Sequence, residues 1–417
     1  MEHALGIDIG TSGVRAAVLH GDGSEGASAA HRFANEHKRA PSAWLAALEA
    51  VLGELDLGRV GAIAVDGTSG TLVGLNADGA AVAGPLMYDD RTDDAGLIAR
   101  IDAVAPATSA ARGAGSGAAK ALRLLAEPGV VRIAHQADLL VHALTDRADL
   151  SDESNALKTG YDPIARRWPD WLEAVRLDRA RLPTVQPVGV PLAPVTAGAA
   201  ARFGLPTGAL VVGGLTDGCA SFLATGASRP GEGVTALGTT LTLKTLSDRP
   251  VSASGYGIYS HRIGGMWLAG GASNSGGAVL AQHFAPDAIE RLSAEIDPNV
   301  DAGDFYPLPR PGERFPVADP GLEPVMPEPT GDAVHLHGLL EGVARVEAMG
   351  YARLAELGAP AVTRVFTVGG GAANAVWTAI RARRLGAEMA TPRSPDAAVG
   401  AARVALAHLR GVAVGAA

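Results

Sequence analysis

The sequence predicts an α/β protein made of two domains of similar build, and three observations support this prediction. Short apolar runs alternate with segments of helical periodicity, and many of the 54 glycines stand singly or in pairs where these runs end. A strand, a Gly-Thr-Ser/Thr turn and a second strand occur at Gly10 and again at Gly238, about half the chain apart. Hydrophobic residues make up 47% of the 417 residues, enough to form large cores. Two such domains would have a cleft between them.

The composition excludes several classes of protein. The formal net charge is −9 and no run of Lys or Arg occurs, which argues against a nucleic-acid or anionic-membrane partner. The single cysteine, Cys219, excludes an internal disulfide and a cysteine-based zinc or iron–sulfur site. No apolar stretch reaches the roughly 18 residues of a membrane span, and the first residues lack the basic start of a signal peptide. We therefore expect a cytoplasmic monomer or homodimer that binds a small soluble ligand.

Two hairpins and a helix are predicted in the first part of the chain. The first hairpin joins residues 5–9 to residues 14–19 through four turn-forming residues. Ser42 is a suitable N-cap for a helix, because the leucines that follow it have helical spacing. Residues 62–65 and 72–75 would form the second hairpin around an Asp-Gly turn.

The second part of the chain contains a third hairpin, which joins residues 234–237 to residues 241–243. Farther on, residues 365–368 are predicted as a strand, followed by a glycine turn and a helix over residues 374–385. Gly386 would end this helix. A last helix is predicted with Ser394 as its N-cap and with Gly411 after its end.

Asp8 and the turn that follows it form the first candidate site. The turn Gly10-Thr11-Ser12-Gly13 offers backbone N–H groups and two hydroxyls, which can bind phosphate oxygens. An ordinary hairpin turn would explain the same residues. Asp8 favours the functional interpretation, because a carboxylate inside an apolar strand needs a cation or hydrogen-bond donors. Mg²⁺ on a nucleotide is a suitable partner.

Asp217 is the second candidate. It follows an apolar strand at residues 209–212 and precedes a short apolar segment, residues 220–224, that we expect to be helical. Asp217 could be a helix N-cap, or a general base at the carboxyl end of a strand, and both can be true together. Asp66 has a similar setting, but Asp-Gly is so common in turns that the turn interpretation is favoured.

The glycine-rich segment Gly369–Asn374 is the third candidate. It follows a predicted strand, as a dinucleotide-binding fingerprint would. Asn374 stands where that fingerprint requires a small residue, and the unit lies too near the C-terminus for a full dinucleotide domain. A flat base lying on bare backbone explains the segment better.

Taken together, these segments resemble the FGGY carbohydrate kinases, which belong to the superfamily of sugar kinases, actin and Hsp70, along nearly the entire chain. Four motifs occur in the order of that family: a first phosphate motif at residues 5–15, a catalytic-base segment at 215–219, a second phosphate motif at 236–240 and an adenosine motif at 368–374. Further similarity lies at residues 87–91, Lys120, residues 151–162 and residues 312–314.

The resemblance implies the fold and the domain organisation. We expect two actin-like, ribonuclease H-like domains with a cleft between them. Residues 1–224 would form the N-terminal domain on the sugar, magnesium and phosphate side, with residues 395–417 returning as its last helix. Residues 225–394 would form the C-terminal domain on the ATP side.

The resemblance also implies an ATP-dependent phosphotransferase that acts on an alcohol group, with ATP and Mg²⁺ as cofactors. Asp217 would be the catalytic base that takes the proton of the sugar hydroxyl, and Asp8 would help to hold Mg²⁺. Asp8, Ser69 and Asp217 would contact the sugar. ATP and its phosphates would be bound by Thr11, Ser12, Gly238, Thr239, Thr240, Gly276, Gly370, Gly371 and Asn374.

Residues 65–71, 87–91 and 270–277 look most like the compact subgroup of D-ribulose kinases. Phosphorylation of D-ribulose to D-ribulose 5-phosphate is therefore the first expectation. D-xylulose, another ketopentose or a polyol is the alternative, because epimers differ by the direction of one hydroxyl, which motif spacing does not report. An actin-like or Hsp70-like ATPase without a small acceptor is less favoured, since Asp217 and the compact Thr-Ser loops fit a small-acceptor site better.

Overall fold

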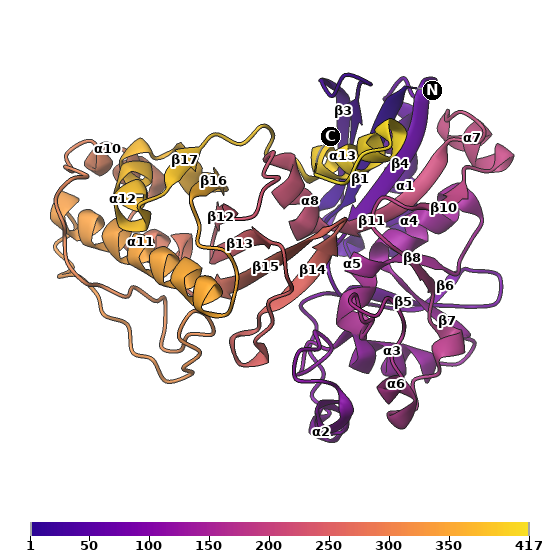
Figure 1. Cartoon of the computed structure of the whole chain (residues 1–417), viewed down its shortest axis with the longest axis horizontal. Coiled ribbons are helices and arrows are strands. Elements are labelled where there is room, and N and C mark those ends of the chain that lie inside the picture. The colour runs from indigo at the N-terminus through magenta and orange to yellow at the C-terminus, as the bar shows by residue number, and fades with distance from the viewer. Residues whose placement is uncertain (1, 416–417) are drawn as a thin grey trace. The chain divides into compact units, whose positions relative to one another are not determined.

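The structure, a computed structural model, describes residues 2–415 and divides into two compact units (Figure 1). Unit 1 contains residues 2–226 and 396–415 together with a short segment from the middle of the chain, residues 261–265. Unit 2 contains residues 227–260 and 266–395. Each unit is built on one six-stranded sheet, and helices complete its core.

The main sheet of unit 1 has the strand order β10-β11-β4-β1-β2-β3. Its strands are β1 (His3–Ile9), β2 (Gly13–Leu19), β3 (Glu25–Arg32), β4 (Val60–Gly67), β10 (Pro191–Pro194) and β11 (Leu210–Thr216). β1 and β2 pair antiparallel, which confirms the first predicted hairpin. β1, β4 and β11 run parallel, so that their carboxyl ends lie at the same edge of the sheet.

The second predicted hairpin is wrong. β4 pairs with β1 on one side and with β11 on the other, and all eight of its residues are buried. No edge of β4 is therefore left for β5 (Leu72–Leu75), which pairs instead with β6 (Ala81–Leu86) and β7 (Arg132–His135) in a separate sheet. Continuous burial is typical of a central parallel strand.

The remaining elements of unit 1 are a pair of short strands and a set of helices. Two short strands, β8 (Leu150–Asp152) and β9 (Thr184–Gln186), pair with each other. The helices are α1 (Pro41–Gly53), α2 (Ala95–Val104), α3 (Gly117–Leu125), α4 (Gln136–Thr145), α5 (Glu153–Ala156), α6 (Trp171–Ala174), α7 (Ala197–Phe203), α8 (Asp217–Ala224) and α13 (Ala397–Arg410).

Two of the predicted helix starts are displaced. α1 begins at Pro41, so Ser42 lies inside the helix and is not its N-cap. In α13 the N-cap is Asp396, whose carboxylate accepts a hydrogen bond from the Ala398 N–H, whereas Ser394 lies outside the helix. A carboxylate is favoured at this position because it faces the positive end of the helix dipole. Gly411 ends α13 in the left-handed conformation, as predicted.

α13 connects the C-terminal part of the chain to the central strands of unit 1. It packs across β1, β4 and β2 and against α8 (Figure 1). Gly6 allows this close approach, because a Cβ atom there would lie 1.9 Å from the carbonyl oxygen of Ala398. Gly400 does the same toward α8, since its Cβ would lie 1.9 Å from the carbonyl oxygen of Ala220.

The sheet of unit 2 repeats the central three-strand arrangement of unit 1. Its order is β14-β15-β13-β12-β16-β17, formed by β12 (Glu232–Leu237), β13 (Leu241–Ser247), β14 (Tyr259–Ile263), β15 (Met266–Ser273), β16 (Arg364–Val368) and β17 (Glu388–Ala390). β12 pairs antiparallel with β13, as the third predicted hairpin requires, and parallel with β16. The first strand of each unit therefore has an antiparallel neighbour on one side and a parallel one on the other.

Four helices belong to unit 2: α9 (Gly277–His283), α10 (Pro286–Ser293), α11 (Ala333–Glu356) and α12 (Ala375–Leu385). α12 has Asn374 as its N-cap and ends at Gly386, which agrees with the helix predicted over residues 374–385. Residues 308–329 contain no helix or strand beyond isolated bridges. Among the described residues, no helix is both long and apolar enough to cross a membrane.

Candidate active site

Three aspartates lie at the carboxyl ends of the parallel strands of unit 1. Asp8 on β1 and Asp66 on β4 are direct partners in the register of the two strands. Asp66 is in turn opposite Leu215 on β11, and Asp217 follows the end of that strand. We call Asp8, Asp66 and Asp217 the acid cluster. Ligands of α/β proteins typically bind at this end of the strands.

Asp8 is almost completely buried, with 3% of its surface exposed. Its Oδ2 atom accepts a hydrogen bond from Nη1 of Arg15 at 3.0 Å, while Oδ1 has no hydrogen-bond partner among the described residues. Burial raises the pKa of Asp8, and the charge of Asp217 adds to this increase, whereas the charge of Arg15 and its hydrogen bond lower the pKa. Asp8 therefore has one oxygen that is still able to accept a donor or a cation.

Asp66 is the functional candidate that the sequence interpretation missed. It does not lie in a turn but within β4, with no exposed surface, and neither carboxylate oxygen has a hydrogen-bond partner among the described residues. Burial, followed by the charge of Asp8, raises the pKa of Asp66 well above its ordinary value. The apolar residues before Asp66 were the sequence signal that could have identified it, whereas the parallel pairing of β4 with β1 is seen only in the structure.

Asp217 occupies the first turn of α8, and Thr216 precedes it as the N-cap. The N-cap interpretation of Asp217 is therefore wrong by one residue, whereas the predicted helix at residues 220–224 is confirmed. The Asp217 side chain is half-buried, and its Oδ1 accepts a hydrogen bond from the Gly218 N–H at 2.6 Å. The helix turn and this hydrogen bond fix the position of the Asp217 carboxylate.

The end of β11, just before Asp217, is anchored by a neighbouring helix turn. Nδ2 of Asn155 donates to the carbonyl oxygen of Leu215 at 3.0 Å and to Oδ2 of Asp152 at 2.7 Å. Oγ of Ser154 accepts from the Thr216 N–H at 3.2 Å. Burial raises the pKa of Asp152 to about 6, although the hydrogen bonds with Asn155 oppose this increase.

Two turns accompany the acid cluster. Thr11 and Ser12 form the exposed turn between β1 and β2, directly after the strand that carries Asp8. Ser69 lies in the turn after β4, and its hydroxyl oxygen is buried without a hydrogen-bond partner among the described residues. These positions bring small polar groups to the end of the sheet where the aspartates lie.

Lys120 on α3 holds the turn that contains Ser69. Its ammonium group is buried and donates to the carbonyl oxygens of Gly70, Met87 and Tyr88 at 2.9, 2.6 and 3.3 Å. The Lys158 ammonium donates to the carbonyl oxygen of Ser69 at 3.0 Å. Burial, followed by the charge of Lys158, lowers the pKa of Lys120 to about 8.

Unit 2 contains a pocket of about 720 Å³, which we call the unit 2 pocket. Its lining includes five predicted ATP-binding residues, namely Gly238, Thr239, Gly370, Gly371 and Asn374. Leu237, Leu280, Phe284, Ile289 and Trp377 make much of the remaining surface apolar. Flat, apolar walls beside exposed backbone suit a base with attached phosphates.

Two predicted ATP-binding residues, Thr240 and Gly276, do not belong to this lining but support it. Gly277 and Ala278 donate their N–H groups to the carbonyl oxygens of Gly238 and Thr239 at 2.8 and 3.0 Å. Gly276 has a positive φ of 140°, and a Cβ atom there would lie 2.8 Å from the Leu241 nitrogen and from the Thr240 carbonyl carbon. Only glycine allows the start of α9 to approach the turn at residues 238–240 so closely.

The side chain of Asn374 has two partners within unit 2. Its Oδ1 accepts from the Trp377 N–H at 2.9 Å, and its Nδ2 donates to Oγ of Ser293 at 2.8 Å. Asn374 therefore fixes the start of α12 to α10. A second pocket, of about 430 Å³, lies beside Asn374 and Gly370 and includes Ser293 in its lining.

The acid cluster fits a divalent cation that also binds phosphate. Mg²⁺ prefers oxygen ligands and commonly takes one or two carboxylates together with substrate phosphates. The buried Oδ1 of Asp8 and both oxygens of Asp66 have no hydrogen-bond partner among the described residues, so they could accept such a charge. Within the described part of the chain, no three His, Cys, Asp or Glu side chains form a complete protein cage for a metal.

Comparisons with known proteins agree with this description. Residues 233–409 match the C-terminal domain of the FGGY family of carbohydrate kinases. A xyloylose kinase from Brucella ovis has the same fold with a TM-score of 0.87 and 22% identity, over 99% of this chain and 92% of its own. A xylulose kinase from Rhodospirillum rubrum has a TM-score of 0.84 and 25% identity, over 97% of this chain and 89% of its own. The fold is thus the two-domain, actin-like fold that was expected.

A glycerol kinase from Plasmodium falciparum, solved with ADP, shares the fold at lower identity. Its TM-score is 0.82 and its identity 14%, over 98% of this chain and 90% of that protein.

Proposed function

We propose that this chain, whose residues 233–409 match the C-terminal domain of the FGGY family of carbohydrate kinases, is a carbohydrate kinase that transfers the terminal phosphoryl group of ATP to a ketopentose. D-ribulose is the first candidate substrate, and D-ribulose 5-phosphate would be its product. The observation that carries the proposal is the acid cluster, in which half-buried Asp217 stands beside buried Asp8 and Asp66 at the carboxyl ends of three parallel strands.

Asp217 would act as the general base. The hydroxyl oxygen of the sugar attacks the γ-phosphorus, the bond from this phosphorus to the bridging oxygen breaks, and ADP leaves with that oxygen. The hydroxyl proton passes to the Asp217 carboxylate and then to water. Phosphoryl transfer has a loose transition state, so alignment of the hydroxyl contributes more than strong basicity. The first turn of α8 holds Asp217 at a fixed place for this task.

Asp8 would hold Mg²⁺, and the free Oδ1 atom supports this assignment. When bound, the cation neutralises negative charge on the phosphates. Asp66, beside Asp8 in the register, keeps a second carboxyl group at the site. Thr11 and Ser12 would donate hydrogen bonds to phosphate oxygens from the exposed turn after β1.

The unit 2 pocket would bind the nucleotide. Gly238, Thr239 and Thr240 would surround the phosphates, and Gly276, Gly370, Gly371 and Asn374 would hold the adenosine. The apolar side chains of Phe284, Ile289 and Trp377 in the lining support a flat base at this place.

Asp8, Ser69 and Asp217 would contact the sugar. The buried, unpartnered hydroxyl of Ser69 supports its role, because a sugar hydroxyl would complete its hydrogen bonding. D-xylulose, another ketopentose or a polyol is the alternative within the same activity. An ATPase without a small acceptor is disfavoured because the similar structures are kinases of small molecules.

The proposal is tested by release of ADP from ATP and Mg²⁺ in the presence of a panel of sugars: D-ribulose, D-xylulose, L-ribulose, D-ribose, ribitol and glycerol. We expect a sugar-dependent rate that is largest with D-ribulose. A larger rate with another member of the panel would reassign the substrate. ADP release unchanged by every sugar would reject the kinase proposal for these acceptors.

A further inference from the structure

We infer that the buried ion pair of Arg381 with Glu347 is a positioning element of the unit 2 pocket. It fixes β12 and β16, the two strands that lead into the proposed phosphate turn at residues 238–240 and the proposed adenosine segment at residues 369–374. The inference rests on the proposed nucleotide site, because it concerns how that pocket keeps its shape. Neither side chain belongs to the pocket lining, so their action would be indirect.

The pair is formed by two helices and has no exposed surface. Arg381 on α12 donates from Nε to Oε2 of Glu347 at 2.6 Å and from Nη2 to Oε1 at 2.8 Å. Glu347 lies on α11, and both side chains are 0% exposed. Two parallel hydrogen bonds between a guanidinium and a carboxylate fix the orientation of both groups.

The pair also holds one hydroxyl from each of two strands. Nη1 of Arg381 donates to Oγ1 of Thr367 on β16 at 2.9 Å, and Oγ1 of Thr235 on β12 donates to Oε1 of Glu347 at 2.5 Å. Because the Thr235 proton goes to the carboxylate, the Tyr351 hydroxyl, 2.9 Å away, donates to Thr235. Burial, followed by the charge of Glu347, raises the pKa of Tyr351, which keeps this hydroxyl a donor.

Thr235 and Thr367 are direct partners in the parallel register of β12 and β16. Each lies close to the end of its strand, after which the chain forms the phosphate turn at Gly238 and the adenosine segment at Gly370. The ion pair therefore joins the two strands at the same level, immediately before both segments enter the pocket lining. Since α12 carries Arg381 and has Asn374 as its N-cap, the start of the helix is tied to the same level.

A buried ion pair is an inefficient way to stabilise a core, because desolvation of the charges opposes their attraction. Apolar side chains of similar size would pack α11 against α12 equally well. The ion pair instead fixes orientation, because its two side chains take part in four hydrogen bonds between defined atoms on two helices and two strands. This supports a positioning role over a purely stabilising one.

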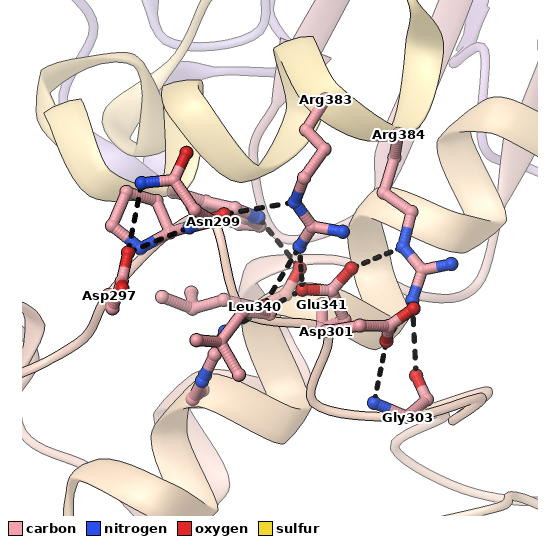
Figure 2. Close-up of polar contacts among 12 residues, drawn as sticks. Asp297, Asn299, Asp301, Gly303, Leu340, Glu341, Arg383 and Arg384 are labelled. Carbon is pink, nitrogen blue, oxygen red and sulfur yellow. Dashed lines mark hydrogen bonds and ion pairs between the residues drawn. The ribbon is translucent and has the colours of Figure 1, made fainter.

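The same two helices contain a matched control, shown in Figure 2. Glu341 on α11 is also buried, and it binds Arg383 and Arg384 of α12. These arginines contact the loop around Asp301 and Gly303 instead of the strands: Nη2 of Arg384 donates to Oδ1 of Asp301 at 2.6 Å. The Glu341 cluster thus has comparable chemistry on the same helices without a link to β12 or β16.

The sharpest test leaves the ion pair in place and cuts its link to the strands. The double variant Thr235→Val with Thr367→Val keeps the side-chain shape and removes both hydroxyls. We expect the Kd for ADP with Mg²⁺, measured by calorimetry, to rise about tenfold, and the KM for ATP to rise similarly. The KM for the sugar should stay within twofold, because the proposed sugar contacts belong to unit 1.

A second variant, Arg381→Met with Glu347→Leu, replaces the pair by apolar side chains and should weaken ADP binding in the same way. Arg384→Met is the control, and it should lower thermal stability without changing the Kd for ADP. If the second variant does not fold, the threonine variant decides alone. Wild-type affinity for ADP in the threonine variant, or equal losses in Arg384→Met, would overturn the inference. If the wild-type protein itself binds no ADP, the proposed function fails instead.

Discussion

At the scale of single residues, the properties of the candidate site depend on how deeply each of its carboxylates is buried. Asp8 and Asp66 face each other across two neighbouring strands, and like charges at such a place disfavour simultaneous ionisation. The pKa of Asp66 rises more strongly than that of Asp8, which also has Arg15 as a partner. Asp217 differs from both, because it is only half-buried and lies in the first turn of α8.

Asp217→Asn should lower kcat at least about 100-fold, because a positioned general base contributes at least that much. Folding and ADP binding should be nearly unchanged, since an amide keeps the size of the side chain and the unit 2 pocket does not include Asp217. Steady-state rates and ADP calorimetry measure the two effects separately. A kcat close to that of the wild-type protein would show that another group is the base.

At the scale of elements, features that depend on neighbouring residues were predicted correctly more often than strand pairs between distant segments. The first and third hairpins and the helix ending at Gly386 depend on neighbours in the sequence, and the structure confirms them. The sequence alone could not show that the second hairpin is wrong, because the strands that pair with β4 are distant in the chain. Asp66 was missed for the same reason: its Asp-Gly dipeptide has the composition of a turn, but strand pairing buries it.

Helix starts were less predictable than helix ends. Glycine at a C-terminus is selected by a backbone conformation that other residues avoid, as Gly386 and Gly411 illustrate. Several residues in one segment can cap an N-terminus, so Asp396 could not be distinguished from nearby Ser394. The role of Lys120 also depends on tertiary contacts, because its three acceptors lie in two separate loops.

Lys120 predicts an alkaline limit to sugar binding. A protonated amine has three donors for its three carbonyl acceptors, whereas the neutral amine has two. With the pKa near 8, the KM for the sugar should rise as the pH increases through this value. The groups that act on this pKa are Lys158 and Arg123, which lower it, and Asp89 and Asp90, which raise it. Lys120→Met should have a higher KM that is independent of pH in this range.

High pH should weaken sugar binding through Lys120, but it should increase the stability of the fold through the same residue. Because folding lowers the pKa of Lys120 from 10.5 to about 8, the unfolded chain binds more protons between these values. The free energy of unfolding of the wild-type protein, relative to that of Lys120→Met, should therefore increase as the pH rises from about 8 to 10.5. This gain in stability is lost again as the pH falls to 8. Urea titrations at pH 7 and pH 10 measure the difference. Lys38→Met, at a partly exposed site, is the control and should change neither trend.

At the scale of the whole molecule, the two proposed halves of the site are assigned to different units. The acid cluster and Ser69 belong to unit 1, and the lining of the unit 2 pocket belongs to unit 2. The hydrophobic cluster around β1 and β4 and the cluster around α11 and β12 have no residue in common. A ligand that binds one unit should therefore stabilise that unit first.

ADP without sugar should slow amide hydrogen exchange selectively in unit 2. At a concentration of 100 Kd, binding stabilises the state that binds by about 2.7 kcal/mol, which slows exchange through opening of that unit about 100-fold. The slowed amides should include those of β12, β16 and α12, which contribute to the pocket lining or lead into it. Those of β1 and β4 should exchange at unchanged rates until a sugar is added. Equal protection of both sheets by ADP alone would mean that the units open together, and protection confined to β1 and β4 would assign the nucleotide to unit 1.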